Sequence, residues 1–100
     1  MTINDFMNER LDTIKTIINE IPTSNFDSHE FIRRFAKEFE VDYVKFLSKY
    51  DAEPFKKIHA QIAINLLNNK IHLRIEKSGK ISSANIFGIE DQNEQWIRKP

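Results

Sequence analysis

The sequence contains no cysteine, only two glycines and no long apolar run. Without cysteine the chain cannot form a disulfide framework, a thiolate zinc site or a cysteine nucleophile, and it fits a reducing cytoplasm. Two glycines are too few for a Gly-rich phosphate-binding loop. No stretch is long enough to span a membrane, and the N-terminal segment MTINDFMNERLD lacks the apolar core of a signal peptide. We therefore expect a cytoplasmic protein without a membrane segment.

The chain also lacks a net charge, because 15 Lys and Arg residues balance 15 Asp and Glu residues. The charges are unevenly distributed, however. Residues 1–53 carry seven basic and eleven acidic side chains, whereas residues 54–100 carry eight basic and four acidic ones. A basic C-terminal half is consistent with binding to a polyanion. A net charge of zero is unusual for a dedicated nucleic-acid binder.

What the chain does contain is typical of one globular domain over residues 1–100. Hydrophobic residues make up 40% and aromatic residues 11%, and eight of the aromatic residues are Phe, which suits a core. No repeat, low-complexity segment or linker divides the sequence. One hundred residues are enough to bury a core without covalent cross-links.

Apolar residues at helical spacing predict four helices, over residues 2–21, 28–39, 43–50 and 54–69. Pro22 ends the first helix, and Asp27 with Glu30 forms a capping box for the second. Asp42 is the expected N-cap of the third helix, and Pro54 occupies the first position of the fourth, where proline is favoured. The third helix is expected to present Val44, Leu47 and either Phe46 or Tyr50 inward.

The fourth predicted helix is apolar over more than half of its circumference, so it is expected to be largely buried. Its remaining narrow arc carries Lys57, Gln61, Asn65 and Asn68. Gln and Asn side chains can pair bidentately with adenine in the major groove, so this stripe is a candidate recognition surface. The alternative is a plain solvated face, since every amphipathic helix has one.

The apolar period changes from 3.6 to 2 after residue 70, which predicts a β-hairpin over residues 71–87. Its expected turn is Lys77–Lys80, where a glycine can adopt a positive φ. Residues 82–85 fit either a bulged strand or a helical turn, and residues 95–98 fit either a third strand or a packed tail.

Four basic side chains gather around this hairpin and could contact phosphates. They are Lys70, Arg74, Lys77 and Lys80. The alternative is that these charges keep an exposed sheet edge soluble.

No arrangement of side chains suggests catalysis or metal binding. The three histidines, His29, His59 and His72, have no metal-ligand spacing on one helix face. Ser82 and Ser83 lack the context of a nucleophile elbow, and several carboxylates are explained as helix caps. We therefore expect neither an enzyme nor a metal or other cofactor.

The order of these predicted elements resembles a winged helix-turn-helix domain over residues 26–98, with the helix over residues 2–21 as an N-terminal addition. The resemblance concerns the order of elements and not a sequence motif. It implies an α+β fold, mainly α, in which four helices precede a C-terminal hairpin, the wing. In that family the third helix of the unit enters the major groove, while the wing contacts the neighbouring backbone or minor groove. The positions so implicated are Lys57, Gln61, Asn65 and Asn68 on the helix, and Lys77 and Lys80 on the wing.

Two functions are compatible with this interpretation, because many winged-helix domains bind proteins instead of DNA. The first is a small intracellular regulatory protein that binds double-stranded DNA. The second is a protein-interaction module, either a homodimer through residues 2–21 or an adaptor for another protein. For that module Tyr43 and Trp96 are expected to be exposed aromatic anchors.

Overall fold

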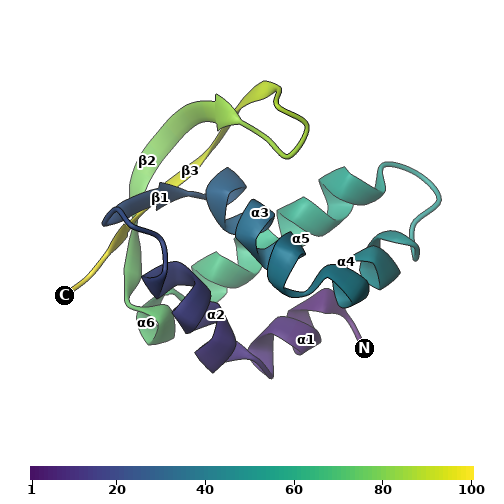
Figure 1. Ribbon diagram of the computed structural model, residues 1–100, viewed down its shortest axis with the longest axis horizontal. Coiled ribbons are helices and arrows are strands. Elements are labelled where there is room, and N and C mark those ends of the chain that lie inside the picture. The colour runs from purple at the N-terminus through teal and green to yellow at the C-terminus, as the bar shows by residue number, and fades with distance from the viewer.

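The chain folds as an α+β protein, mainly α, in which helices precede a C-terminal β-hairpin, as predicted. The computed structural model describes all of residues 1–100 (Figure 1). The elements are α1 (Ile3–Asn8), α2 (Leu11–Asn19), β1 (Asn25–Asp27), α3 (Ser28–Glu38), α4 (Glu40–Leu47), α5 (Pro54–Asn68), α6 (Lys70–Leu73), β2 (Ile75–Ala84) and β3 (Glu90–Arg98). None of the helices combines the length and the apolar character that crossing a bilayer requires.

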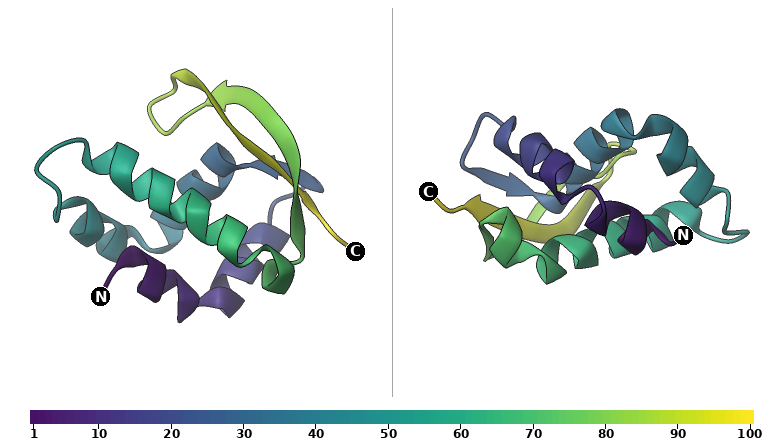
Figure 2. Two further views of the ribbon diagram at one scale, coloured as in Figure 1. Left: turned by 180° about the vertical axis from the view of Figure 1, so that it is seen from behind. Right: turned by 90° about the horizontal axis from the view of Figure 1, so that it is seen from below.

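The three strands form an antiparallel sheet in the order β1-β3-β2, so β3 is central and β2 is an edge strand. The helices form the rest of the molecule, and the β2–β3 hairpin curves over α3 and α5 (Figure 1). Nineteen buried apolar residues form one cluster that draws on helices and sheet alike. Seen from behind, α5 runs across the front of the molecule beneath the hairpin loop (Figure 2, left).

The single helix predicted over residues 2–21 is instead two helices, α1 and α2, which meet at Glu9 and Arg10. Arg10 has φ −127° and ψ 31°, outside the helical region. A straight helix of 20 residues would extend about 30 Å, whereas the break allows α1 to pack on α5 and α2 on α3. Most apolar residues of both helices are buried in the protein's own core, and Leu11 packs against it partly buried.

The Asp27 cap of α3 is confirmed, because its Oδ1 accepts a hydrogen bond from the Glu30 backbone N–H at 2.8 Å. The Glu30 carboxylate does not return to the cap, as a complete capping box requires. It pairs instead with Arg33 at 3.0 Å and Arg34 at 3.1 Å on its own helix. Only the Asp27 half of the capping box is therefore formed. Glu30 instead forms ion pairs on the surface of α3.

Helix α4 begins three residues earlier than predicted, and the residues that it buries also differ from the prediction. Its N-cap position is Phe39, so Asp42 lies inside the first turn and is not the cap. In the observed helix the Tyr43 side chain is buried, whereas the Val44 side chain is 53% exposed. The expectations for these two side chains, an exposed Tyr43 and an inward Val44, were therefore both wrong.

Helix α5 agrees with its predicted bounds to within one residue and begins at Pro54. No side chain caps its N-terminus, and Glu53 at that position adopts the left-handed conformation with φ 49°. The apolar spacing was sufficient to locate this helix because Ile58, Ile62 and Leu66 are all buried.

The hairpin lies further along the chain than predicted. Residues 70–73 are the short helix α6, which ends at Arg74 in the left-handed conformation, with φ 58°. The predicted turn at Lys77–Lys80 is a β-bulge inside β2, where pairing passes from Lys77↔Trp96 to Gly79↔Gln95 and leaves Ser78 unpaired. Gly79 supplies the positive φ of 111° at this bulge.

The true hairpin turn spans residues 85–89 and is organised by Asn85. Its Oδ1 accepts hydrogen bonds from the backbone N–H groups of Phe87 at 2.9 Å and Ile89 at 3.1 Å. Gly88 provides the left-handed position, with φ 78°. An Asn side chain that bonds to backbone groups just ahead of it is a common way to build a turn.

Strand β1 was missed, and its pairing with β3 explains why Trp96 is not exposed. Phe26 lies opposite Trp96 in the sheet. The indole of Trp96 is 1% exposed, and its Nε1–H donates to Ser28 Oγ at 3.0 Å. The expected exposed anchor is therefore a core residue whose polar atom is satisfied internally.

Candidate interaction surface around helix α5

The polar stripe predicted on α5 is divided between the core and the surface. Asn65 is completely buried, and its Nδ2 donates to Oδ1 of Asn4 at 2.7 Å and of Asn8 at 3.0 Å, both on α1. Asn69 joins the same cluster by donating to Asn8 Oδ1 at 3.1 Å. Asn65 therefore holds α1 against α5 and presents no atom to an outside partner.

The next two members of the stripe contact the segment that leads into α5. Gln61 donates through Nε2 to the hydroxyl of Tyr50 at 2.9 Å. The ammonium group of Lys57 lies 5.3 Å from the centroid of the same ring, a cation–π distance. Only Asn68, at the far end of the helix, is exposed without such a contact.

The basic residues of the hairpin region do not form one positive surface. Lys77 and Lys80 lie 3.7 Å and 3.8 Å from the same oxygen of Glu94, so one carboxylate offsets part of their charge. Lys70 is exposed on α6, and the Arg74 guanidinium donates to the carbonyl of Pro100 at 2.6 Å. The eight predicted site residues are thus spread over the core, the sheet and the α6 end of the molecule.

Instead, α5 exposes apolar side chains, and they lie on more than one of its sides. Phe55 is 36% exposed at its start, and Ala60 is also exposed. Ile64 is 54% exposed, but it follows Phe55 by nine residues and so lies on the opposite side of the helix. The hairpin loop adds Phe87 and Ile89, which are 59% and 63% exposed. Single exposed apolar residues are ordinary, but several in one region indicate an interaction site.

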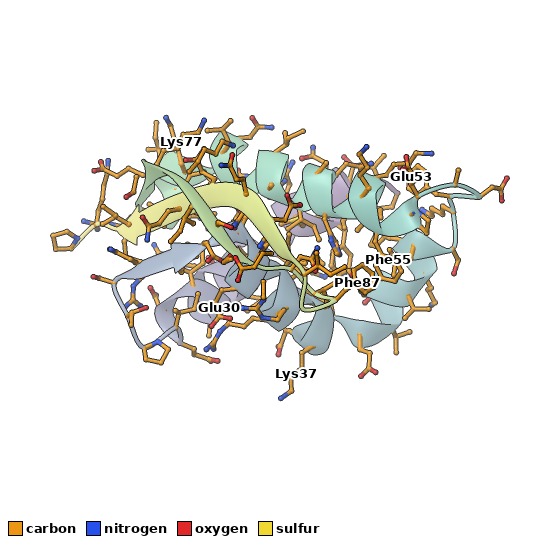
Figure 3. The ribbon with its side chains drawn as sticks, turned by 90° about the horizontal axis from the view of Figure 1, so that it is seen from above. Glu30, Lys37, Glu53, Phe55, Lys77 and Phe87 are labelled. Carbon is orange, nitrogen blue, oxygen red and sulfur yellow. The ribbon has the colours of Figure 1, made fainter.

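Phe55 and Phe87 join these two regions. Their ring centroids are 4.8 Å apart in an edge-to-face arrangement, so the hairpin loop rests on the start of α5. Figure 3 shows the two rings side by side there, whereas Lys77 lies toward the opposite end of the hairpin. We call the exposed surface made by α5 and the hairpin loop the α5–hairpin face. Its members are Phe55, Lys56, Ala60, Phe87 and Ile89.

A pocket of about 560 Å³ opens beside this contact, between α3, α5 and the hairpin. Its apolar lining includes Ile32, Ala60 and Ala63, together with the two phenylalanines. Its polar lining carries both signs of charge, and those residues are Lys56, Lys80, Asp91 and Glu94. This pocket could not be predicted from the sequence, because its three walls come from distant parts of the chain.

His59 forms part of the pocket wall and is bonded to α4. Its Nε2 lies 2.6 Å from the Tyr43 hydroxyl. Burial lowers the pKa of His59 to about 4 and raises the pKa of Tyr43 to about 12, with the nearby His29 adding slightly to the first effect. Both side chains are consequently uncharged at neutral pH. His59 is thus a hydrogen-bonded, partly buried side chain.

The Tyr43 hydroxyl and His59 Nε2 have no other hydrogen-bond partner within the protein. Either of them can be the donor, according to the tautomer of the imidazole. His59 Nδ1 has no hydrogen-bond partner in the protein, and the side chain forms part of the pocket wall.

A second polar cluster ties the hairpin to the start of α3. Asn93 accepts from the backbone N–H of His29 at 3.0 Å and donates to Ser83 Oγ at 3.0 Å. His29 Nδ1 lies 3.0 Å from the same Ser83 oxygen. These contacts position the hairpin over α3. No group of three or more His, Cys, Asp or Glu side chains is arranged to hold a metal ion.

No protein family, curated protein or solved structure matches the chain. The function must therefore be argued from the geometry of this surface.

Replacing Asn65 tests the assignment of the stripe to the core. Asn65→Ala removes the donor shared by Asn4 and Asn8, so we expect the free energy of unfolding to fall by about 1–3 kcal/mol. The matched change Asn68→Ala, three residues along the same helix, should alter it by less than about 0.5 kcal/mol. Urea denaturation followed by circular dichroism measures both, and equal effects would contradict the assignment.

The environment of His59 predicts a pH dependence of stability. Its pKa of about 4 in the folded protein lies below the ordinary value of 6.5, so between these values the unfolded chain binds more protons. We therefore expect the midpoint of thermal unfolding to fall as the pH drops from 6.5 toward 4. The control variant His59→Gln should show a smaller decrease over this window, and an identical decrease would exclude His59 as the cause.

Proposed function

We propose that this chain is a protein-interaction module that binds its partner through the α5–hairpin face. The observation that carries this proposal is the set of exposed apolar side chains on that face, with Phe55 and Phe87 in contact at its centre. Cores of protein interfaces are rich in aromatic side chains and poor in charged ones. Charged groups at the edge of this face, Lys56 and Asp91 among them, fit the polar rim that surrounds such cores.

The same observations weaken the support for DNA binding. Asn65 is internal, and the two hairpin lysines share Glu94. The hairpin loop is followed at once by Glu90 and Asp91, which would repel phosphates. We keep the resemblance to a winged helix-turn-helix domain as part of the proposal, with α5 and the hairpin as its third helix and wing. In this proposal the two elements contact a protein.

Two exposed isoleucine and valine side chains provide a matched test of the binding face. Ile89 in the hairpin loop is 63% exposed and Val41 on α4 is 67% exposed, so a change to serine should cost each position similarly little stability. Ile89→Ser and Phe87→Ser should each abolish retention of the partner in affinity capture from a native lysate, whereas Val41→Ser should preserve it. Retention by all three variants, or loss by all three, contradicts the proposed face.

Binding to double-stranded DNA is the second candidate, favoured by exposed cations on α5 and α6. These are Lys56, Lys57 and Lys70. If DNA is the target, fluorescence anisotropy at low salt should detect binding to a mixed duplex, and the affinity should fall as salt rises, because phosphate contacts release counterions. The double change Lys56→Gln with Lys57→Gln should then weaken binding to every sequence. No binding at about 100 µM protein excludes this function, because even non-specific affinities are stronger than that.

A further inference from the structure

A second pocket opens where the C-terminal segment passes α2 and α6. Its volume is about 630 Å³, and it shares no lining residue with the pocket beside the Phe55–Phe87 contact. Figure 1 shows α2, α6 and β1 together with the C-terminus at this end of the molecule, away from the hairpin loop. Four of its eight lining residues are basic and none is acidic, so we call it the basic pocket. The four are Lys15, Arg74, Arg98 and Lys99.

Neighbouring groups offset two of these four charges. Lys99 Nζ lies 3.5 Å from the carboxylate of Glu76, which does not line the pocket. Arg74 Nη2 donates to an oxygen of Pro100 at 2.6 Å, so a carboxylate at that residue would offset the charge of Arg74. Counting both carboxylates against the four cations still leaves an excess of two positive charges.

The excess belongs to Lys15 and Arg98, which have no carboxylate within 4.0 Å. Asp12 and Glu20, the acidic residues in and just after α2, do not line the pocket. Arg98 Nη1 donates to two backbone carbonyls at the C-terminal end of α2, at 3.3 Å and 3.1 Å. These bonds hold the guanidinium in place and leave its Nε and Nη2 groups as donors toward a ligand.

Neutral donors complete the lining of the basic pocket. The side-chain amide of Asn19 and the hydroxyl of Ser24 both line it, and neither forms a hydrogen bond within the protein. Leu73 and Pro100 are its only apolar residues, and no aromatic residue lines it. The pocket therefore suits a ligand that is negatively charged and rich in acceptor oxygens, and it has no ring on which a nucleobase could stack.

Arg74 lines this pocket from an unfavourable backbone conformation. With φ 58° and ψ 49° it ends α6 in the left-handed region, where glycine or asparagine is usual. Its carbonyl accepts a hydrogen bond from the backbone N–H of Lys99 at 2.8 Å, which joins α6 to the C-terminal segment. Residues in such conformations are concentrated at functional sites. The presence of an arginine where glycine would fit more easily is thus explained if its side chain binds a ligand.

We propose that the basic pocket binds a small soluble compound through a phosphate group. A phosphate group carries up to two negative charges and three acceptor oxygens, and arginine pairs with it in a bidentate manner. Lys15 and Arg98 offset its charge, while Asn19 and Ser24 donate to its remaining oxygens. The pocket lies apart from the α5–hairpin face, so this inference goes beyond the proposed function and does not depend on it.

Titration of the ¹⁵N-labelled protein with pyrophosphate at constant ionic strength tests the inference. Pyrophosphate presents phosphate oxygens and nothing else. We expect it to shift the amide resonances of Lys15, Ser24 and Arg74 with a dissociation constant of about 1 mM or lower, as befits so small a ligand. Sodium chloride at the same ionic strength should leave these resonances in place.

Two matched lysine variants separate a site from a general effect of charge. Lys15→Gln removes one of the two unpaired cations and should weaken pyrophosphate binding about tenfold. Lys37→Gln, on the exposed side of α3 and outside the basic pocket, changes the net charge equally and should leave the affinity unchanged. Equal affinities of the two variants, or no shift at about 10 mM pyrophosphate, would overturn the inference.

Arg74→Gly separates binding from folding. Glycine adopts a positive φ without a steric penalty, so the midpoint of thermal unfolding should not fall. The affinity for pyrophosphate should nevertheless fall about tenfold, because a guanidinium group that lines the pocket is lost. A lower midpoint together with an unchanged affinity would show that Arg74 has only a structural role, and this result would contradict the inference.

Two further titrations distinguish the source of the phosphate group. One uses a DNA duplex of about 12 base pairs, and the other uses vesicles that contain an anionic phospholipid. We expect neither to bind more tightly than pyrophosphate. Tighter binding of either one, weakened by Lys15→Gln, would assign the pocket to a nucleic-acid backbone or a membrane surface and would exclude the small soluble ligand.

Discussion

The packing of α1 on α5 depends on one buried side-chain amide, that of Asn65. It is fully buried in α5 and donates to two asparagines of α1. A buried amide that lost these partners would be costly, so α1 can pack on α5 only in the orientation that provides them. That orientation directs Asn65 into the protein and leaves Lys57, Ile64 and Asn68, which share one side of the helix, at the surface. The predicted polar stripe is thereby divided between the core and the surface.

The hairpin depends on a comparable set of internal polar contacts. Asn93 on β3 accepts a hydrogen bond from the start of α3. Trp96, on the same strand, donates to Ser28, the first residue of α3. The hairpin loop then reaches α5 through Phe87. The pocket wall is therefore supported at both ends, by hydrogen bonds on α3 and by an aromatic contact on α5. A binding site built in this way keeps its shape without a ligand, which lowers the entropic cost of binding.

The sequence was most informative where one helix could be recognised from its own residues. The spacing of Ile58, Ile62 and Leu66 located α5, and Asp27 located the start of α3. It failed where the outcome depended on tertiary contacts. The period of α1 and α2 is continuous, so nothing local marks the break at Arg10. A three-residue strand such as β1 has no period at all, and without it the burial of Trp96 could not be inferred.

The candidate site was harder to predict than the fold, for a physical reason. A helical wheel separates polar from apolar residues but does not say whether a polar arc meets water or another helix. Asn65 and Gln61 had the right chemistry for recognition and are used internally. The glycines were similarly ambiguous, because Gly79 and Gly88 both adopt positive φ, one in a bulge and the other in the loop. Only the pairing of β2 with β3 distinguishes the two roles.

The bulge in β2 has a consequence for how copies of this protein behave at high concentration. β2 is an edge strand, and a long, regular edge is a template on which further strands can add, which leads to aggregation. The unpaired Ser78 interrupts the regular series of backbone groups along this edge, and Lys77 and Lys80 place charges on either side of the interruption. A second copy cannot extend the sheet there without burying an ammonium group and skipping a residue. The bulge that made the hairpin hard to locate in the sequence thus also opposes extension of the sheet by a second copy.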